Sequence, residues 1–226
     1  MEPPLNITRR AFCEGTGAVA LATLVLASST SLLALTRVAR AQQSISPAEL
    51  LQPSTLGDRQ LGPDNAPVTI VEYASLTCPH CANFHKTSLP ELKKRYIDTG
   101  KVRLIFREFA LNPLDAGAMM LARCLDKDKY FDFVDILFQK QEQWVVQKPI
   151  EPLLAIARQA GFTKERFEAC LKNQQVLDGI EAQRNRAADR FGVNSTPTFF
   201  INGKIARGGL TLEELEKEIK PYLDVK

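Results

Sequence analysis

The stretch VTIVEYASLTCPHC, residues 68–81, joins an expected strand to an expected helix. Val68–Ala74 is rich in β-branched residues and ends at a turn signal, which predicts a strand. Apolar residues recur at helical spacing from Pro79 to about Asp98, which predicts a helix. Cys78 and Cys81 therefore lie where the strand passes into the first turn of the helix.

The residues that follow continue with a strand and then a long helical region. Val102–Phe109 has the pattern of a second strand, and residues 113–191 are helical in pattern throughout. Pro90 predicts a kink in the first helix, and Gly161 and Gly192 predict helix ends. A helix between the first two strands makes them a parallel pair.

Strand patterns return after this helical region. Thr198–Ile201 and Lys204–Arg207 flank Asn202-Gly203, the pair preferred in a type I′ hairpin turn. Thr211–Glu214 has the spacing of a capping box and opens a last helix. The predicted fold class is therefore α/β, with a central mixed sheet flanked by helices and an inserted helical domain.

The composition excludes several classes of protein. The chain has 226 residues, 45% hydrophobic and 24% charged, which fits one buried core with an insertion and not a disordered chain. The net charge is +3, and residues 1–41 hold four arginines against two glutamates, which leaves +1 for the remainder. A nearly neutral body argues against a nucleic-acid partner.

The N-terminal residues read as an export signal. Thr8–Phe12 contains two adjacent arginines and resembles the twin-arginine export motif. An uncharged run follows over Gly15–Thr36, and Ala39-Arg40-Ala41 has the small residues of a signal-peptidase site. We expect residues 1–41 to be a signal peptide that directs export to a bacterial periplasm. The alternative is an uncleaved membrane anchor, because the 22-residue run is long enough to span a bilayer.

The Cys78-Pro79-His80-Cys81 motif carries the chemistry. Two thiols at this spacing can close a small disulfide across the first turn of a helix. The helix N-terminus stabilises an anion at Cys78, and a protonated or donating His80 adds to this effect. We therefore expect an exposed Cys78 with a lowered pKa and a more buried Cys81. The alternatives are a structural disulfide or half of a zinc site, for which only His80 and His85 are present as histidines; we expect no metal and no organic cofactor.

The motif, the helical insertion and the late Thr196-Pro197 together resemble the DsbA family of thiol:disulfide oxidoreductases. The resemblance implies a thioredoxin fold, formed by residues 58–112 and 192–226, with residues 113–191 as the inserted helical domain. Residues 42–57 are then a linker, and a short strand is expected near Arg59-Gln60-Leu61.

The resemblance also implies the role of each residue in the site. Cys78 matches the nucleophile, Cys81 the resolving thiol and His80 the histidine that tunes the potential. Pro197 matches a cis-proline that packs against the active-site disulfide, and Thr196 offers backbone groups to an extended substrate peptide.

Three further residues either have an alternative interpretation or depart from the pattern of the family. Glu72 matches a buried acid that relays a proton for Cys81, although a solvated strand residue is the alternative. Thr196 replaces the valine of the best-known members and is shared with isomerases and reductases. His85 stands where some members carry an acid, and a surface position is expected for it.

Two further cysteines, Cys124 and Cys170, lie in the helical insertion. Some alphaproteobacterial-type relatives carry a second disulfide, which the resemblance implies for this pair. It would close a loop of about 47 residues and stabilise the fold by roughly 3–4 kcal/mol. Two separate buried thiols are the alternative.

The sequence thus predicts a monomeric periplasmic oxidoreductase that gives its Cys78–Cys81 disulfide to reduced exported proteins. A quinone-linked membrane partner, implied by the family, would reoxidise it. The alternatives are a disulfide isomerase or reductase, and a non-catalytic peptide-binding chaperone on the same fold.

Overall fold

The computed structural model describes residues 45–223, so the export signal expected over residues 1–41 lies outside the described part. No helix within that part is long and apolar enough to cross a membrane. The elements follow in the order α1 (Pro47–Leu50), β1 (Arg59–Leu61), β2 (Val68–Ala74), α2 (Pro79–Leu92), the π-helix η1 (Lys93–Ile97), β3 (Val102–Glu108), α3 (Pro113–Arg123), α4 (Lys127–Gln139), α5 (Gln141–Trp144), α6 (Ile150–Gln159), α7 (Lys164–Leu171), α8 (Gln174–Phe191), β4 (Thr198–Ile201), β5 (Lys204–Arg207) and α9 (Leu212–Leu223).

The five strands form one mixed sheet in the order β1-β3-β2-β4-β5. The pair β2 and β3 is parallel, as predicted from the helix between them. The pairs β1–β3, β2–β4 and β4–β5 are antiparallel. In the β4–β5 turn, φ is 45° at Asn202 and 87° at Gly203, so both residues have the positive φ that a type I′ turn requires.

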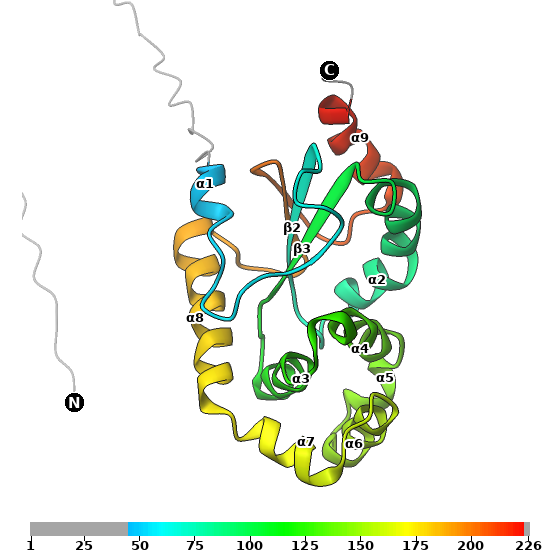
Figure 1. Ribbon diagram of the computed structural model, residues 1–226, viewed down its shortest axis with the longest axis vertical. Coiled ribbons are helices and arrows are strands. Elements are labelled where there is room, and N and C mark those ends of the chain that lie inside the picture. Colours follow the sequence, from blue (N-terminus) through cyan, green and yellow to red (C-terminus); the bar gives the residue numbers. More distant parts are fainter. Residues whose placement is uncertain (1–44, 224–226) are drawn as a thin grey trace, which may run out of the picture. The chain divides into compact units, whose positions relative to one another are not determined.

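Helices cover both faces of the sheet (Figure 1). On one face, Ile70 of β2 packs in a cluster with residues of α2 and α9. On the other face, Val71 packs in a cluster with residues of α1 and α8. Neighbouring residues of β2 point to opposite faces, so this strand is buried on both of its sides.

The helices α3–α7 lie beside the end of β2 and β3 (Figure 1), whereas α8, which the insertion expected over residues 113–191 also included, packs against the sheet. Their core also includes Ala74, Leu76, Cys78 and Cys81. The fold is therefore the thioredoxin fold with a mixed sheet, flanking helices and a helical insertion, and the cysteine motif lies where sheet and insertion meet.

Two local predictions differ from the structure. The helix expected over residues 79–98 is α-helical only to Leu92 and continues as the π-helix η1. Pro90, the expected kink, lies inside α2, where its ring nitrogen cannot complete the helical hydrogen-bond pattern. The expected linker, residues 42–57, contains the helix α1, and its Leu50 is only 1% exposed.

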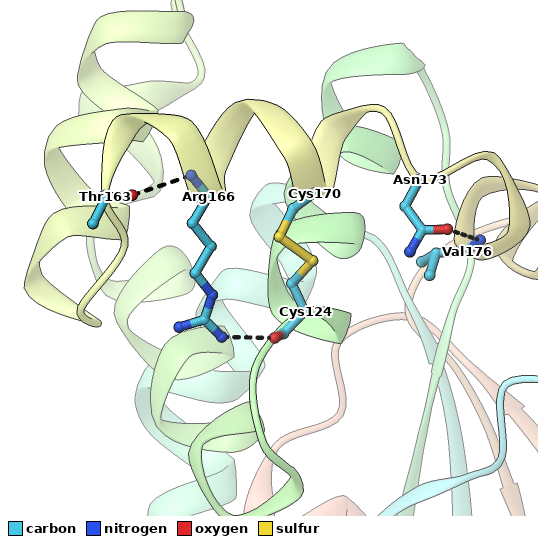
Figure 2. The surroundings of a disulfide bond; sticks show 6 residues. All are labelled: Cys124, Thr163, Arg166, Cys170, Asn173 and Val176. Carbon is cyan, nitrogen blue, oxygen red and sulfur yellow. Dashed lines mark hydrogen bonds between the residues drawn. A yellow bond between two sulfur atoms is a disulfide. The ribbon is translucent and has the colours of Figure 1, made fainter.

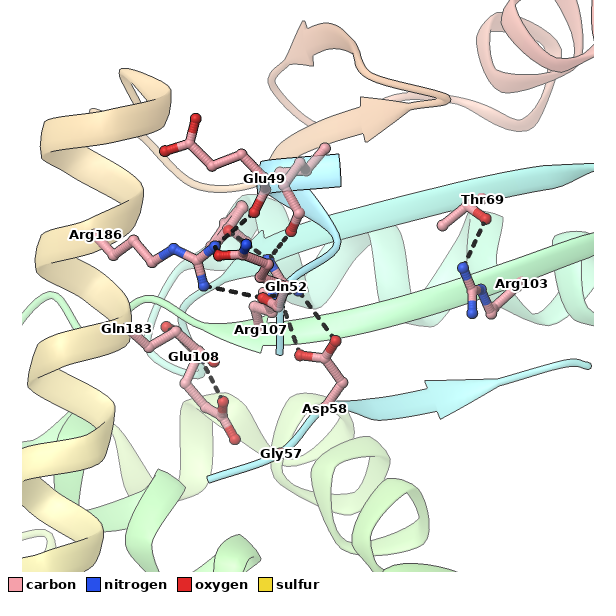
Figure 3. A network of polar contacts seen from close by, with 12 residues as sticks. Glu49, Gln52, Gly57, Asp58, Thr69, Arg103, Arg107, Glu108, Gln183 and Arg186 are labelled. Atoms are coloured by element: carbon pink, nitrogen blue, oxygen red, sulfur yellow. Dashed lines mark hydrogen bonds and ion pairs between the residues drawn. The ribbon is translucent and has the colours of Figure 1, made fainter. Parts of the chain in front are cut away.

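Contacts with arginines of β3 and α8 hold this segment in place (Figure 3). The Arg107 guanidinium donates to the Leu50 carbonyl at 2.6 Å and pairs with Asp58 at 3.0 Å. Arg186 of α8 donates to the carbonyls of Glu49 and Gln52. Arg107 and Arg186 are far away from this segment in the sequence. The composition of residues 42–57 therefore gave no sign of these contacts and predicted a linker.

A second buried ion pair joins β3 to α3. Glu108 is fully buried and accepts hydrogen bonds from Arg123 and from the Tyr130 hydroxyl. Burial raises the pKa of Glu108, but the charge and hydrogen bonds of Arg123 outweigh burial and lower it. The pair therefore holds an ionised carboxylate at the junction of sheet and insertion.

We predict that Arg123→Met destabilises the fold by about 3–5 kcal/mol, because it leaves the Glu108 carboxylate buried without its positively charged partner. The matched control is Arg190→Met, which removes the exposed pair between Arg190 and Glu49 and should cost less than about 1 kcal/mol. Urea unfolding measures both. Equal costs for the two variants would contradict this role of the buried pair.

Candidate active site

The site begins where β2 ends and α2 begins. Cys78 is the N-cap residue of α2, with extended backbone angles, and Pro79 occupies the first helical turn. The first turn of a helix has free backbone N–H groups, so Pro79 costs no hydrogen bond there. The Cys78 side chain therefore lies at the positive end of the helix dipole.

The two cysteines are free thiols in different surroundings. Cys81 is completely buried, and Cys78 is 7% exposed. The expectation of an exposed Cys78 is therefore wrong, although the order of burial is as expected. Cys78 Sγ lies against the loop before β4 and donates a hydrogen bond to the Thr196 carbonyl at 3.3 Å.

The two thiols differ in acidity. A hydrogen bond from Cys81 lowers the pKa of Cys78 to about 5, with further help from Thr196 and from the backbone amides of Cys81 and His80, although burial opposes the shift. Burial raises the pKa of Cys81 well above its ordinary value, and the Cys78 contact and the charge of Glu72 raise it further. A pair of this kind holds one thiolate and one thiol at neutral pH.

His80 contributes to this acidity through its backbone. Its amide stabilises the Cys78 thiolate, and the residue itself is exposed. The imidazole is therefore on the surface beside the cysteine pair, where an incoming molecule can reach it.

The peptide bond between Thr196 and Pro197 is cis. The Thr196 hydroxyl is buried and has no hydrogen-bond partner among residues 45–223 in the dithiol form. The Thr196 side chain lowers the pKa of Cys78, although its hydroxyl makes no hydrogen bond to the Cys78 thiol in this structure. The structure thus brings Cys78, Cys81, Thr196 and Pro197 together.

Beneath the cysteines lies a cluster of titratable side chains. Glu72 is fully buried and His85 is 3% exposed, so the alternatives of a solvated Glu72 and a surface His85 are wrong. His85 Nε2 lies 3.2 Å from Glu72 Oε2, and Nδ1 lies 3.4 Å from Asp135 Oδ1. Burial lowers the pKa of His85, but the two carboxylates outweigh it and raise the pKa to about 9.

Two residues of the insertion fix the loop before Cys78, and sequence reasoning missed both. Asp115 accepts from the amides of Leu76 and Leu111 at 2.8 and 2.9 Å. Gln141 donates to the carbonyls of Leu76 and Cys78 at 2.8 and 3.0 Å. Neither residue belongs to a motif, and only the packing of the insertion against the loop reveals them.

Cys124 and Cys170 form a disulfide, which joins the end of α3 to α7 (Figure 2). Arg166 of α7 donates to the Cys124 carbonyl at 2.9 Å, and Thr163 caps α7 by accepting from the Arg166 amide. The bond therefore links elements within the insertion, whereas Cys78 and Cys81 lie where the insertion meets the sheet.

Fold and site define the class of thioredoxin-fold proteins with a Cys-X-X-Cys pair at the start of a helix opposite a cis-proline. A family model described as thioredoxin matches residues 54–221. The chain belongs to the thioredoxin family and, within it, to the DsbA-like proteins.

Individual relatives agree with this assignment. A Rickettsia prowazekii protein named as a protein-disulfide oxidoreductase is 36% identical over 169 residues, which are 74% of this chain and 62% of the relative. The chain thus spans about three fifths of that relative's length. Disulfide bond formation protein D of Bacillus subtilis is 29% identical over 77% of this chain and 81% of its own. The crystal structure of Wolbachia pipientis alpha-DsbA1 matches with a TM-score of 0.73 and 31% identity, covering 79% of this chain and 96% of that one.

We predict that the reduced protein shows a thiolate titration with a midpoint near 5, due to Cys78. Thr196→Val should move this midpoint upward, because it removes a hydroxyl that helps to lower the pKa of Cys78. Ultraviolet thiolate absorbance and the pH dependence of alkylation measure the shift. The control is Thr87→Val, which changes an exposed threonine of α2 whose hydroxyl donates to the Asn83 carbonyl. A midpoint in the ordinary cysteine range of about 8.5 would contradict the assignment.

Proposed function

We propose that this chain is a periplasmic thiol:disulfide oxidoreductase that donates the Cys78–Cys81 disulfide to exported proteins. The single observation that supports this most is the low pKa of Cys78, about 5, beside the raised pKa of Cys81. A stabilised thiolate stabilises the reduced form of the pair, so the disulfide form is a strong oxidant. The cysteine pair carries the electrons, and the proposal needs no organic cofactor or metal.

The proposed reaction begins with a substrate thiolate that attacks Cys78 Sγ. The bond between the substrate sulfur and Cys78 forms, the Cys78–Cys81 bond breaks, and Cys81 leaves with the electron pair. The second substrate thiol then attacks the substrate sulfur of the mixed disulfide and releases Cys78 as a thiolate. A low pKa makes Cys78 a good leaving group in this second step.

The cis-proline loop gives the substrate a place to bind. Thr196 and Pro197 precede β4, and the Thr196 backbone lies against Cys78 Sγ. An extended peptide that runs along this loop would bring its cysteine to Cys78, in the manner of strand addition.

Other observations support the location and partners in the proposal. The Cys124–Cys170 disulfide fits an oxidising compartment, and residues 1–41 have the pattern of an export signal. Relatives from three Bacillus species carry names that refer to disulfide bond formation. We infer that the substrates are reduced exported proteins, that the chain acts as a monomer, and that a quinone-linked membrane partner reoxidises it.

We predict that the oxidised protein forms a disulfide in a reduced dithiol peptide and that Cys78→Ser abolishes this activity, because the substrate then has no sulfur to attack. Mass spectrometry of the peptide measures the product. The matched control is Cys81→Ser, which keeps Cys78 and should form a stable mixed disulfide with a peptide whose cysteine carries a thiopyridyl disulfide, from which Cys78 displaces the thiopyridyl group. Full peptide oxidation by Cys78→Ser would contradict the proposal, and turnover only on scrambled ribonuclease would favour an isomerase.

A further inference from the structure

The loop between β2 and α2, residues 75–77, is held by side chains from α3 and α5. Leu76, in the middle of this loop, is completely buried, so its backbone N–H and C=O groups both need hydrogen-bond partners. Asp115 Oδ1 accepts from the Leu76 amide at 2.8 Å, and Gln141 Nε2 donates to the Leu76 carbonyl at 2.8 Å. Both backbone groups of this residue are therefore satisfied by side chains that are distant in the sequence.

The Asp115 carboxylate joins the loops that leave the neighbouring strands β2 and β3. Its Oδ2 accepts from the amide of Leu111, in the loop after β3, at 2.9 Å. Asn112, the N-cap residue of α3, makes a second link between the same two loops. Its side-chain amide donates to the Thr77 hydroxyl at 3.0 Å, and its side-chain oxygen accepts from the Asp115 amide. The two residues before the nucleophilic cysteine are thus each hydrogen-bonded to the start of α3.

A third contact reaches the nucleophile itself. Gln141, which is only 7% exposed, also donates to the Cys78 carbonyl at 3.0 Å. The same carbonyl accepts from the Ala82 amide, so this contact lies at the start of α2. A fixed Cys78 backbone keeps the sulfur at the N-terminus of the helix, where an anion is stabilised.

The carboxylate of Asp115 costs the fold free energy. The residue is completely buried. Burial raises its pKa to about 6, although hydrogen bonds from Ser75, Leu111 and Leu76 oppose the shift. A raised carboxyl pKa means that the ionised form is destabilised at neutral pH in the folded protein. Proteins accept such costs at functional sites, so the position of this carboxylate beside the cysteine loop points to a role besides stability.

We propose that Asp115 is a positioning residue for the Cys78 sulfur. It acts by fixing Leu76, and Asn112 and Gln141 support the same loop. The proposal rests on the proposed function, in which this sulfur is first attacked and later leaves as a thiolate. Without the carboxylate the loop loosens, the sulfur moves away from the amides of the first turn of α2, and the thiolate becomes less stable.

The test is the equilibrium of the cysteine pair with glutathione at pH 7.5, where the Asp115 carboxyl is ionised, measured by trapping free thiols. In Asp115→Asn the side chain can accept from only one of the amides of Leu76 and Leu111. We expect a shift of at least about threefold towards the disulfide form, the effect of one ordinary hydrogen bond. Loss of the negative charge alone would stabilise the Cys78 thiolate and shift the equilibrium towards the reduced form. The direction of the shift therefore separates positioning from electrostatics.

A role in stability alone gives a different result. It would lower the urea midpoints of the oxidised and reduced forms equally and leave the equilibrium with glutathione unchanged. Asn112→Ser is the second variant, because serine still caps α3 but has no amide to donate to Thr77. It changes an exposed residue and no charge, so it remains informative if Asp115→Asn does not fold. We expect a smaller shift in the same direction.

The matched control is Asp128→Asn, which removes an exposed carboxylate from the first turn of α4, as Asp115→Asn does from the first turn of α3. It should leave the equilibrium unchanged. An unchanged equilibrium in Asp115→Asn, a shift towards the reduced form, or an equal shift in Asp128→Asn would overturn the proposal. If Asp115→Asn does not fold, an unchanged equilibrium in Asn112→Ser would do so. Glutathione reacts with the pair whatever the natural substrate is, so failure of the wild-type protein to oxidise a peptide would overturn only the proposed function.

Discussion

The stabilised thiolate of Cys78 at the start of α2 is the interaction on which the site depends. The chain must deliver this sulfur to the free amides of the first helical turn and keep Cys81 within reach of it. The strand β2 brings the chain to the junction, and Pro79 starts the helix immediately after Cys78. The cis peptide bond at Pro197 places the Thr196 backbone against the same sulfur. The Cys81 hydrogen bond and the helix amides support an anion at this sulfur, and the Thr196 carbonyl accepts a hydrogen bond from its thiol form.

The helical insertion contributes to this site as well as to the core. Asp115 and Gln141 hold the loop before Cys78 from the insertion side, and Asp135 reaches His85 from α4. Buried polar contacts of this kind have little tolerance for movement. The pair between Glu108 and Arg123 and the disulfide between Cys124 and Cys170 tie the insertion together and to the sheet.

The sequence predicted those features that depend on local patterns. The strands follow from runs of β-branched residues, the β4–β5 turn from Asn202-Gly203, and the start of α9 from the reciprocal hydrogen bonds of Thr211 and Glu214. The cysteine pair follows from two thiols that are one helical turn apart at a strand-to-helix junction. These features are determined by residues that are close together in the sequence.

Features that depend on distant partners were missed. The helix α1 is ordered by Arg107 and Arg186, more than fifty residues away in the chain. The histidine His85 is buried because Glu72 and Asp135, 13 and 50 residues away, satisfy both its nitrogens. The low exposure of Cys78 depends on Thr196, 118 residues further along. Composition and periodicity contain no signal for such contacts.

The central claim, that Cys78 stabilises the reduced pair as a thiolate, is tested most directly by equilibrium with glutathione. The mature protein is incubated in glutathione redox buffers at several pH values, and its free thiols are trapped and counted. We predict a potential well above that of the glutathione couple, with a preference for the reduced form that weakens as the pH falls towards about 5, where the thiolate takes up its proton. A potential well below the glutathione couple, or one with no such change in preference, would contradict the account.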